Sequence, residues 1–115
     1  MKKSFPRGFY WGAATASYQV EGGIENTDWA KAAREGRVPP CGLACDHYHR
    51  FESDFDLAKD LGHNAHRFSV EWARIEPEEG KFNFELVDSL IANAKKNDIK
   101  LVFLWFGVWK NTMSC

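Results

Sequence analysis

Hydrophobic side chains recur at helical spacing in two segments of the chain. Residues 46–61 predict a helix that Asp46 can cap at the N-terminus and Gly62 can end at the C-terminus. Its apolar residues are separated by three or four positions, which places them on one face: Tyr48, Phe51, Phe55, Ala58 and Leu61. Residues 86–97 predict a second helix, with an apolar stripe formed by Leu86, Val87, Leu90, Ile91 and Ala94.

Shorter apolar segments between these helices predict strands. Residues 9–16 are aromatic or small, and Gly12 within them allows close approach of another backbone. Residues 64–72 form a second candidate strand, and residues 99–106 are almost continuously apolar. The order is therefore strand, helix, strand, helix, strand, which is typical of parallel strands covered by helices in an α/β fold.

The longest connection runs from Glu21 to Cys45 and follows the first strand. Residues 27–35 within it predict a short helix, with Asn26 or Thr27 as the N-cap and Gly36 at its end. Connections of this length within a domain are usually functional.

Barrels and open α/β sheets both place function beyond the carboxyl ends of their strands. In this chain we expect those ends at residues 17–21, 71–76 and 107–111. With 115 residues the chain is shorter than the ~250 residues of a closed barrel.

Composition excludes several classes of partner. The net charge is −1 and no run of Lys or Arg is present, so we expect no nucleic-acid partner. No apolar stretch reaches the ~20 residues of a membrane helix, so we expect no membrane partner. Lys2 and Lys3 are not followed by an apolar segment of the kind found in secretory signals, and we expect a cytoplasmic location.

Three cysteines do not predict a disulfide framework, because their number is odd and no secretory signal accompanies them. Cys41 and Cys45, with His47 and His49, invite comparison with a zinc site. The two histidines are two positions apart on a predicted helix and therefore do not face the same way. We expect neither a metal nor a cofactor.

Residues 5–22, Phe-Pro-Arg-Gly-Phe-Tyr-Trp-Gly-Ala-Ala-Thr-Ala-Ser-Tyr-Gln-Val-Glu-Gly, closely resemble the N-terminal signature of glycoside hydrolase family 1. Residues 45–50, Cys-Asp-His-Tyr-His-Arg, and residues 66–77 resemble the first helix and second strand of that family. The resemblance covers about residues 5–85. It implies an N-terminal β-α-β-α-β fragment of a (β/α)₈ barrel, with residues 1–115 as one partial barrel domain.

The final segment departs from this pattern. Family members carry a His followed by an aromatic residue after the third strand, whereas this chain reads Trp-Phe-Gly-Val-Trp-Lys-Asn from Trp105 to Asn111. That ending is more similar to a bacterial β-galactosidase-like barrel family. We therefore keep open a chimera joined near residues 78–88; both parent families hydrolyse β-glycosides.

Retaining glycosidases use two carboxyl groups about 5–5.5 Å apart. In family 1 these groups follow the fourth and seventh strands, so the resemblance implies no catalytic residue in this chain. Glu76 precedes a proline, as the family's acid/base does, but it follows the second strand and has Ile75 before it. For Glu76, and for Glu71 within the strand, we expect a structural or solvated role.

The resemblance assigns substrate binding to Gln19 and Arg67. The amide of Gln19 can donate to and accept from two adjacent sugar hydroxyls, or it can cap a strand end. Arg67 matches a family Arg near the nucleophile, where a cation favours the ionised carboxylate, or it forms a structural ion pair. Trp109 and Trp105 can stack on a sugar or pack in the core, and we include Trp109 in the candidate site.

Three function hypotheses follow. The first is a fragment of a retaining β-glycosidase that acts on β-glucosides or β-galactosides, binds a β-linked saccharide and is inactive alone. The second is a non-catalytic carbohydrate-binding or regulatory fragment. The third, an open nucleotide-binding domain, is disfavoured because no Gly-x-Gly-x-x-Gly follows the first strand. Open sheet edges also predict self-association.

Overall fold

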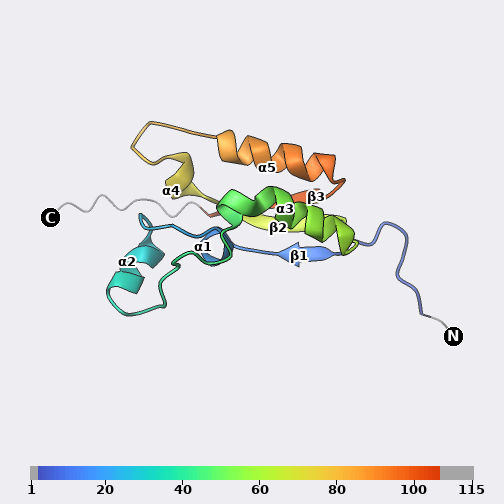
Figure 1. Ribbon diagram of the computed structural model, residues 1–115, viewed down its shortest axis with the longest axis horizontal. Coiled ribbons are helices and arrows are strands. Elements are labelled where there is room, and N and C mark those ends of the chain that lie inside the picture. Colours follow the sequence, from blue (N-terminus) through green and yellow to red (C-terminus); the bar gives the residue numbers. More distant parts are fainter. Residues whose placement is uncertain (1–2, 107–115) are drawn as a thin grey trace.

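A computed structural model describes residues 3–106 of the chain (Figure 1). The elements alternate as the hydrophobic pattern predicts, with two additional short helices. They are β1 (Gly12–Ala14), α1 (Ser17–Val20), α2 (Asp28–Arg34), α3 (His47–Asp60), β2 (Ala65–Glu71), α4 (Trp72–Ile75), α5 (Glu85–Lys96) and β3 (Lys100–Phe106).

The strands form one three-stranded sheet in the order β1-β2-β3. Both pairings are parallel, which confirms the prediction from the alternating pattern. In the register, Arg67 of β2 lies between Ala14 of β1 and Val102 of β3. Chain order and sheet order therefore coincide.

The hydrophobic core lies between one face of the sheet and the helices α3 and α5, which lie on the same side of it (Figure 1). Phe55 of α3 is 2% exposed, and Leu90 and Ala94 of α5 are also buried. These side chains pack with Phe68 and Val70, alternate residues of β2. Alternation along a strand sends the intervening residues of β2, Arg67, Ser69 and Glu71, to the opposite face.

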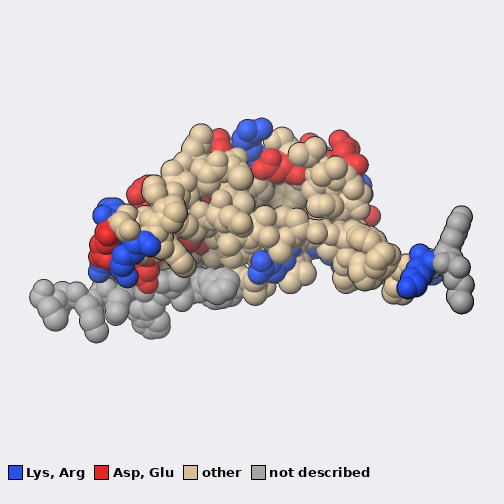
Figure 2. Space-filling model, turned by 90° about the horizontal axis from the view of Figure 1, so that it is seen from below, with Lys and Arg blue, Asp and Glu red and all other residues tan. Residues whose placement is uncertain are grey.

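On that opposite face, α1 covers only the region around Ser69, and no other described helix lies over it. Val102, beside Arg67 in the register, is 54% exposed. Seen from below, charged side chains gather at the end of the molecule that carries α2, whereas the middle of the view is mainly uncharged (Figure 2).

Strand β1 is shorter than predicted, because only Gly12–Ala14 pair with β2. A side chain at Gly12 would place its Cβ 1.8 Å from the carbonyl oxygen of Ala65. The backbones of β1 and β2 therefore approach at this point more closely than any other residue type allows. This confirms the interpretation of Gly12 in the sequence.

Helices α2, α3 and α5 end in the same way, with a residue of positive φ just after the C-cap. Gly36 and Gly62 hold this position after α2 and α3, as predicted, and Asp98 holds it after α5 with φ of 56°. After α5, the amide of Ile99 donates to Ala94 and that of Asp98 donates to Lys95. This pair of bonds is the Schellman motif, which favours glycine.

The predicted N-caps have different outcomes. The side chain of Thr27 accepts a hydrogen bond from the amide of Ala30 and caps α2, as one of the two predictions stated. Asp46 precedes α3 but makes no side-chain cap; its carboxylate instead lies 2.7 Å from Nδ1 of His49. The prediction of an Asp46 cap was therefore wrong.

Candidate functional site

The chain turns into the short helix α1 just beyond the carboxyl end of β1. The amide of Ser17 donates to the hydroxyl of Ser69 on β2, and the two hydroxyl oxygens lie 2.8 Å apart. Both serines are buried. These bonds hold the start of α1 beside the carboxyl half of β2.

Gln19 lies on α1 and is exposed. Residues 17–21 were expected to form the end of a strand. This expectation was wrong about the secondary structure, because Ser17–Val20 are helical. The position of Gln19 beyond the first strand is nevertheless the expected one. Its side chain is open to solvent, not enclosed in the core.

Arg67 is half-buried on β2, on the face opposite the core. The amide of Thr15 donates to its carbonyl oxygen at 2.9 Å, so Arg67 adjoins the segment from which α1 begins. Its Nε is buried without a hydrogen-bond partner, and no described residue forms an ion pair with it. The structural ion pair that the sequence left open is thus not found among residues 3–106.

Trp109, the third predicted binding residue, lies outside the described residues, as do the third strand end at 107–111 and Cys115. The other predicted residues are thus distributed over α1 and β2. Ser17 and Thr15 connect these two elements through backbone and hydroxyl bonds.

Glu76 and Glu71 are both engaged in local structure. The carboxylate of Glu76 accepts from Nε1 of Trp72 and from the amide of Gly80, both at 2.7 Å. Glu71 accepts from the amide of Ala73 at the start of α4, and burial raises the pKa of its carboxyl. Residues 71–76 were expected to be a strand end, but Trp72–Ile75 form a helical turn that these two carboxylates stabilise.

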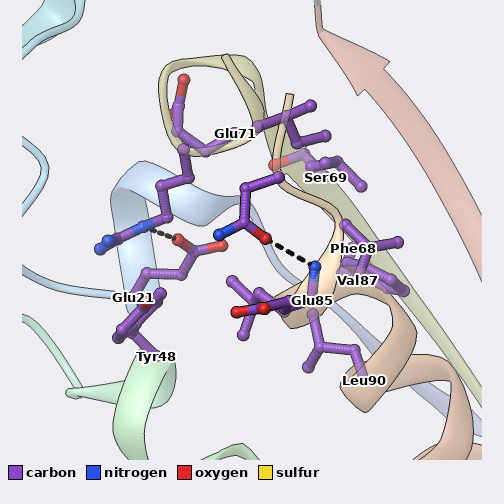
Figure 3. A pocket seen from close by; sticks show the side chains of 13 residues that line it. Glu21, Tyr48, Phe68, Ser69, Glu71, Glu85, Val87 and Leu90 are labelled. Carbon is purple, nitrogen blue, oxygen red and sulfur yellow. Dashed lines mark hydrogen bonds and ion pairs between the residues drawn. The ribbon is translucent and has the colours of Figure 1, made fainter. Parts of the chain in front are cut away.

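A small pocket of about 70 Å³ lies beside the carboxyl half of β2, next to α5 (Figure 3). Ligand pockets are usually larger than ~300 Å³, so this pocket does not suit a sugar ring. Its polar lining includes Glu21, Tyr48 and Arg74. Nε of Arg74 donates to the carboxylate of Glu21 at 2.7 Å, and its guanidinium lies 3.9 Å from the centre of the Tyr48 ring.

The histidines and cysteines of the zinc comparison are directed to different partners. Nδ1 of His47 lies 2.7 Å from Asp54, whereas His49 contacts Asp46. Cys41 donates through its thiol to the carbonyl of Tyr18, and Cys45 is exposed. Among residues 3–106, no cluster of three such side chains could hold a metal ion.

Comparison with known proteins decides the family. Residues 1–106 match the family described as Glycosyl hydrolase family 1. The chain belongs to this family. The match includes β3, and so extends beyond residue 85, where the resemblance in the sequence was placed to end.

Family members with curated names support this assignment. The chain is 40% identical over 97 residues to Beta-glucosidase A of Acetivibrio thermocellus, covering 76% of this chain and 22% of that protein. It is 41% identical over 96 residues to 1,4-beta-D-glucan glucohydrolase of Thermotoga neapolitana, covering 75% of this chain and 23% of that protein. The chain therefore spans less than a quarter of the length of these relatives.

Solved structures of the family share the fold. The family 1 β-glucosidase from Thermotoga maritima superposes with a TM-score of 0.84 and 34% identity, covering 91% of this chain and 27% of that one. It has also been solved in complex with deoxynojirimycin. The parallel sheet with its covering helices is therefore part of a glycoside hydrolase (β/α)₈ barrel, as predicted.

Within this family 1 segment, the ion pair of Glu21 and Arg74 was missed by sequence reasoning. The sequence analysis gave Glu21 no ion-pair partner, and Arg74 lies 53 positions away. No local pattern reveals such a pair.

Among the residues described, no helix is both long and apolar enough to cross a membrane.

Proposed function

We propose that this segment forms part of the glycone-binding site of a retaining β-glycosidase that hydrolyses β-glucosides or β-galactosides. The observation that carries the proposal is the placement of Gln19 and Arg67. Gln19 is exposed just beyond β1, and Arg67 has a buried Nε that no described residue satisfies. A buried donor of this kind normally has a partner, and a carboxylate or a sugar hydroxyl would satisfy it.

A binding titration tests this proposal directly. Methyl β-D-glucoside added to the isotope-labelled chain should shift the side-chain amide signal of Gln19. The variants Gln19→Ala and Arg67→Met should each weaken binding about tenfold, because each removes charged or polar hydrogen bonds to the ligand. Glu52→Gln, an exposed change on α3, serves as the control and should bind like the wild type. Saturating glucoside that leaves the Gln19 signal unmoved contradicts the proposal.

We further propose that the chain alone binds saccharide without turnover, which is also the outcome expected of a non-catalytic carbohydrate-binding fragment. The engagement of Glu71 and Glu76 with nearby backbone and indole groups supports this proposal, since neither carboxylate is free for acid/base work. The assay is release of p-nitrophenol from p-nitrophenyl β-D-glucoside. Release above the rate without protein would overturn the proposal.

The preferred sugar is proposed only as a β-glucoside or a β-galactoside. The β-galactosidase-like resemblance that we propose for residues 105–111 favours galactosides, whereas the named family 1 relatives are a β-glucosidase and a glucohydrolase. Competition between methyl β-D-glucoside and methyl β-D-galactoside in the same titration distinguishes the two. Stronger binding of the galactoside would support the idea of a chimera.

Self-association through the sheet edges is also proposed. The outer edge of β3 extends over seven residues, and no described strand pairs with it. Unpaired backbone groups on a flat edge favour pairing with another chain. Sedimentation at several protein concentrations tests this proposal, and a monomer throughout would contradict it.

A further inference from the structure

The helix that carries Gln19 is too short to hold its own position. Helix α1 has four residues and no side-chain N-cap. Isolated helices of this length are not stable in water, because the first turn fixes several residues for one hydrogen bond. The orientation of Gln19 must therefore come from contacts that α1 makes with the rest of the molecule.

Two sets of contacts hold α1, one at each end. Ser17 bonds to Ser69 of β2 at the start. At the other end, Glu21 is the C-cap residue, and Arg74 of α4 donates to its carboxylate at 2.7 Å and to the carbonyl of Gly22 at 2.6 Å. Figure 3 shows the side chain of Glu21 directed into the pocket, where the dashed line at its carboxylate marks this ion pair.

The ion pair is shielded from water. The side chains of Glu21 and Arg74 are 7% and 23% exposed, and the Tyr48 ring covers the guanidinium. The amide of Tyr48 also donates to the carbonyl of Glu21, so α3 contributes to the same joint. A charge-assisted pair of this kind fixes both direction and distance, which a solvent-exposed pair does not.

We propose that Glu21 and Arg74 are positioning residues that hold α1 and thereby aim Gln19 at the saccharide. This proposal rests on the binding role proposed above for Gln19. The pair does not touch the ligand. It acts through Val20, the one residue between Gln19 and Glu21, and it connects the segments that follow β1 and β2 into one rigid rim. A displacement of only about 1 Å at such a site can reduce function strongly.

The experiment compares three variants with the wild-type chain. Arg74→Met removes the charge and both donors, Glu21→Gln removes the opposite charge, and Arg74→Lys restores the charge without the forked geometry. Glu35→Gln is the matched control, because Glu35 pairs with Arg37 in the same connection but both side chains are exposed. Thermal unfolding is measured first, so that every comparison is made well below the transition of each variant.

Two measurements are then made on each chain. The first is hydrogen exchange of the Val20 and Glu21 amides, which bond within and next to α1. The second is the dissociation constant of methyl β-D-glucoside from the Gln19 signal. We expect Arg74→Met and Glu21→Gln to speed exchange in α1 about tenfold and to weaken glucoside binding about tenfold. Arg74→Lys should give intermediate values for both measurements. Glu35→Gln should change neither.

A purely structural role would lower the unfolding temperature but leave the binding constant of the folded chain unchanged, and this result would overturn the proposal. Failure of the wild-type chain to bind glucoside would overturn the proposed function itself and, with it, the aiming of Gln19. The hydrogen-exchange data would still test whether the ion pair holds α1 in place. Unchanged exchange in Arg74→Met would overturn that part of the proposal as well.

Discussion

The two faces of the sheet differ although they are built from the same strands. On the helix-covered face, Phe68 and Val70 are enclosed by apolar side chains of α3 and α5. On the opposite face, Arg67 has an unsatisfied Nε and Val102 is exposed. Neighbouring residues of a strand point to opposite faces, so one contributes to the core and the next to the candidate site. Substitutions on the two faces should therefore have very different consequences.

The largest expected effect is on the covered face. Phe55→Ala should lower the free energy of unfolding by about 3–5 kcal/mol, because a fully enclosed aromatic ring leaves a cavity. Val102→Ala on the open face should change it by less than about 1 kcal/mol. Urea unfolding measures both variants. Equal losses would mean that the open face is as enclosed as the core, and the comparison would fail.

The second effect concerns the attachment of β1. All three residues of β1 are exposed, so this strand is held by its backbone more than by core side chains. Gly12→Ala should destabilise the chain by about 1–3 kcal/mol, because the new Cβ meets the Ala65 carbonyl and forces the strands apart. Amide exchange should become faster in β1 and at the neighbouring edge of β2. A variant of wild-type stability would contradict the close approach.

The third effect is a pH dependence that belongs to the covered face. His66 is buried next to Phe55, and burial, together with the charges of His47, His63 and Arg67, lowers the pKa of its ring below 6.5. The unfolded chain therefore binds a proton first, and stability should fall as the pH drops below 6.5 towards the lowered pKa. The pKa values of Glu21 and Glu71 are raised, so their protonation stabilises the folded chain as the pH falls. This opposite effect occurs at lower pH, nearer the ordinary carboxyl value of 4.5.

Unfolding by urea at a series of pH values between about 7.5 and 5.5 tests this dependence. His66→Phe keeps an aromatic ring at the site and removes its titration, so its stability should vary less over this range. Parallel curves for the wild type and His66→Phe would show that the ring of His66 does not cause the loss.

The smallest effect is a gain at the end of α5, one of the two covering helices. Asp98 occupies a left-handed position that glycine adopts without strain. Asp98→Gly should therefore raise the free energy of unfolding by up to about 1 kcal/mol, less the entropy that glycine adds to the unfolded chain. Gly62→Ala, at the same position after α3, should lower it by about 1 kcal/mol or more. A loss in Asp98→Gly would point to a role of the carboxylate that the backbone does not explain.

The covered face could be predicted from the sequence because its signals are local and repeated. The spacing of Phe51, Phe55 and Ala58 defines the inner face of α3, and the apolar run from Ile99 defines β3. The ends of α2 and α3 at Gly36 and Gly62 were predicted for the same reason, since glycine adopts positive φ without strain.

The features that were missed depend on distant partners or on too few residues. Helices α1 and α4 have four residues each, which is about one turn and too short to show a period. The ion pair of Glu21 and Arg74 depends on the approach of two segments that only the fold brings together. Asp46 was given the usual role of a residue before a helix, but its backbone adopts a left-handed φ of 55° and its carboxylate contacts His49 instead.

The identity of chain order and sheet order has a consequence for how the molecule forms. Among the described strands, β2 pairs with β1 and β3 pairs with β2, so each pairs with the strand that precedes it in the chain. No described strand needs a partner beyond its neighbouring strands in the chain, so the described sheet can assemble strand by strand as the chain leaves the ribosome. Among the described strands, β3 then forms the edge at which a strand added in chain order would extend the sheet.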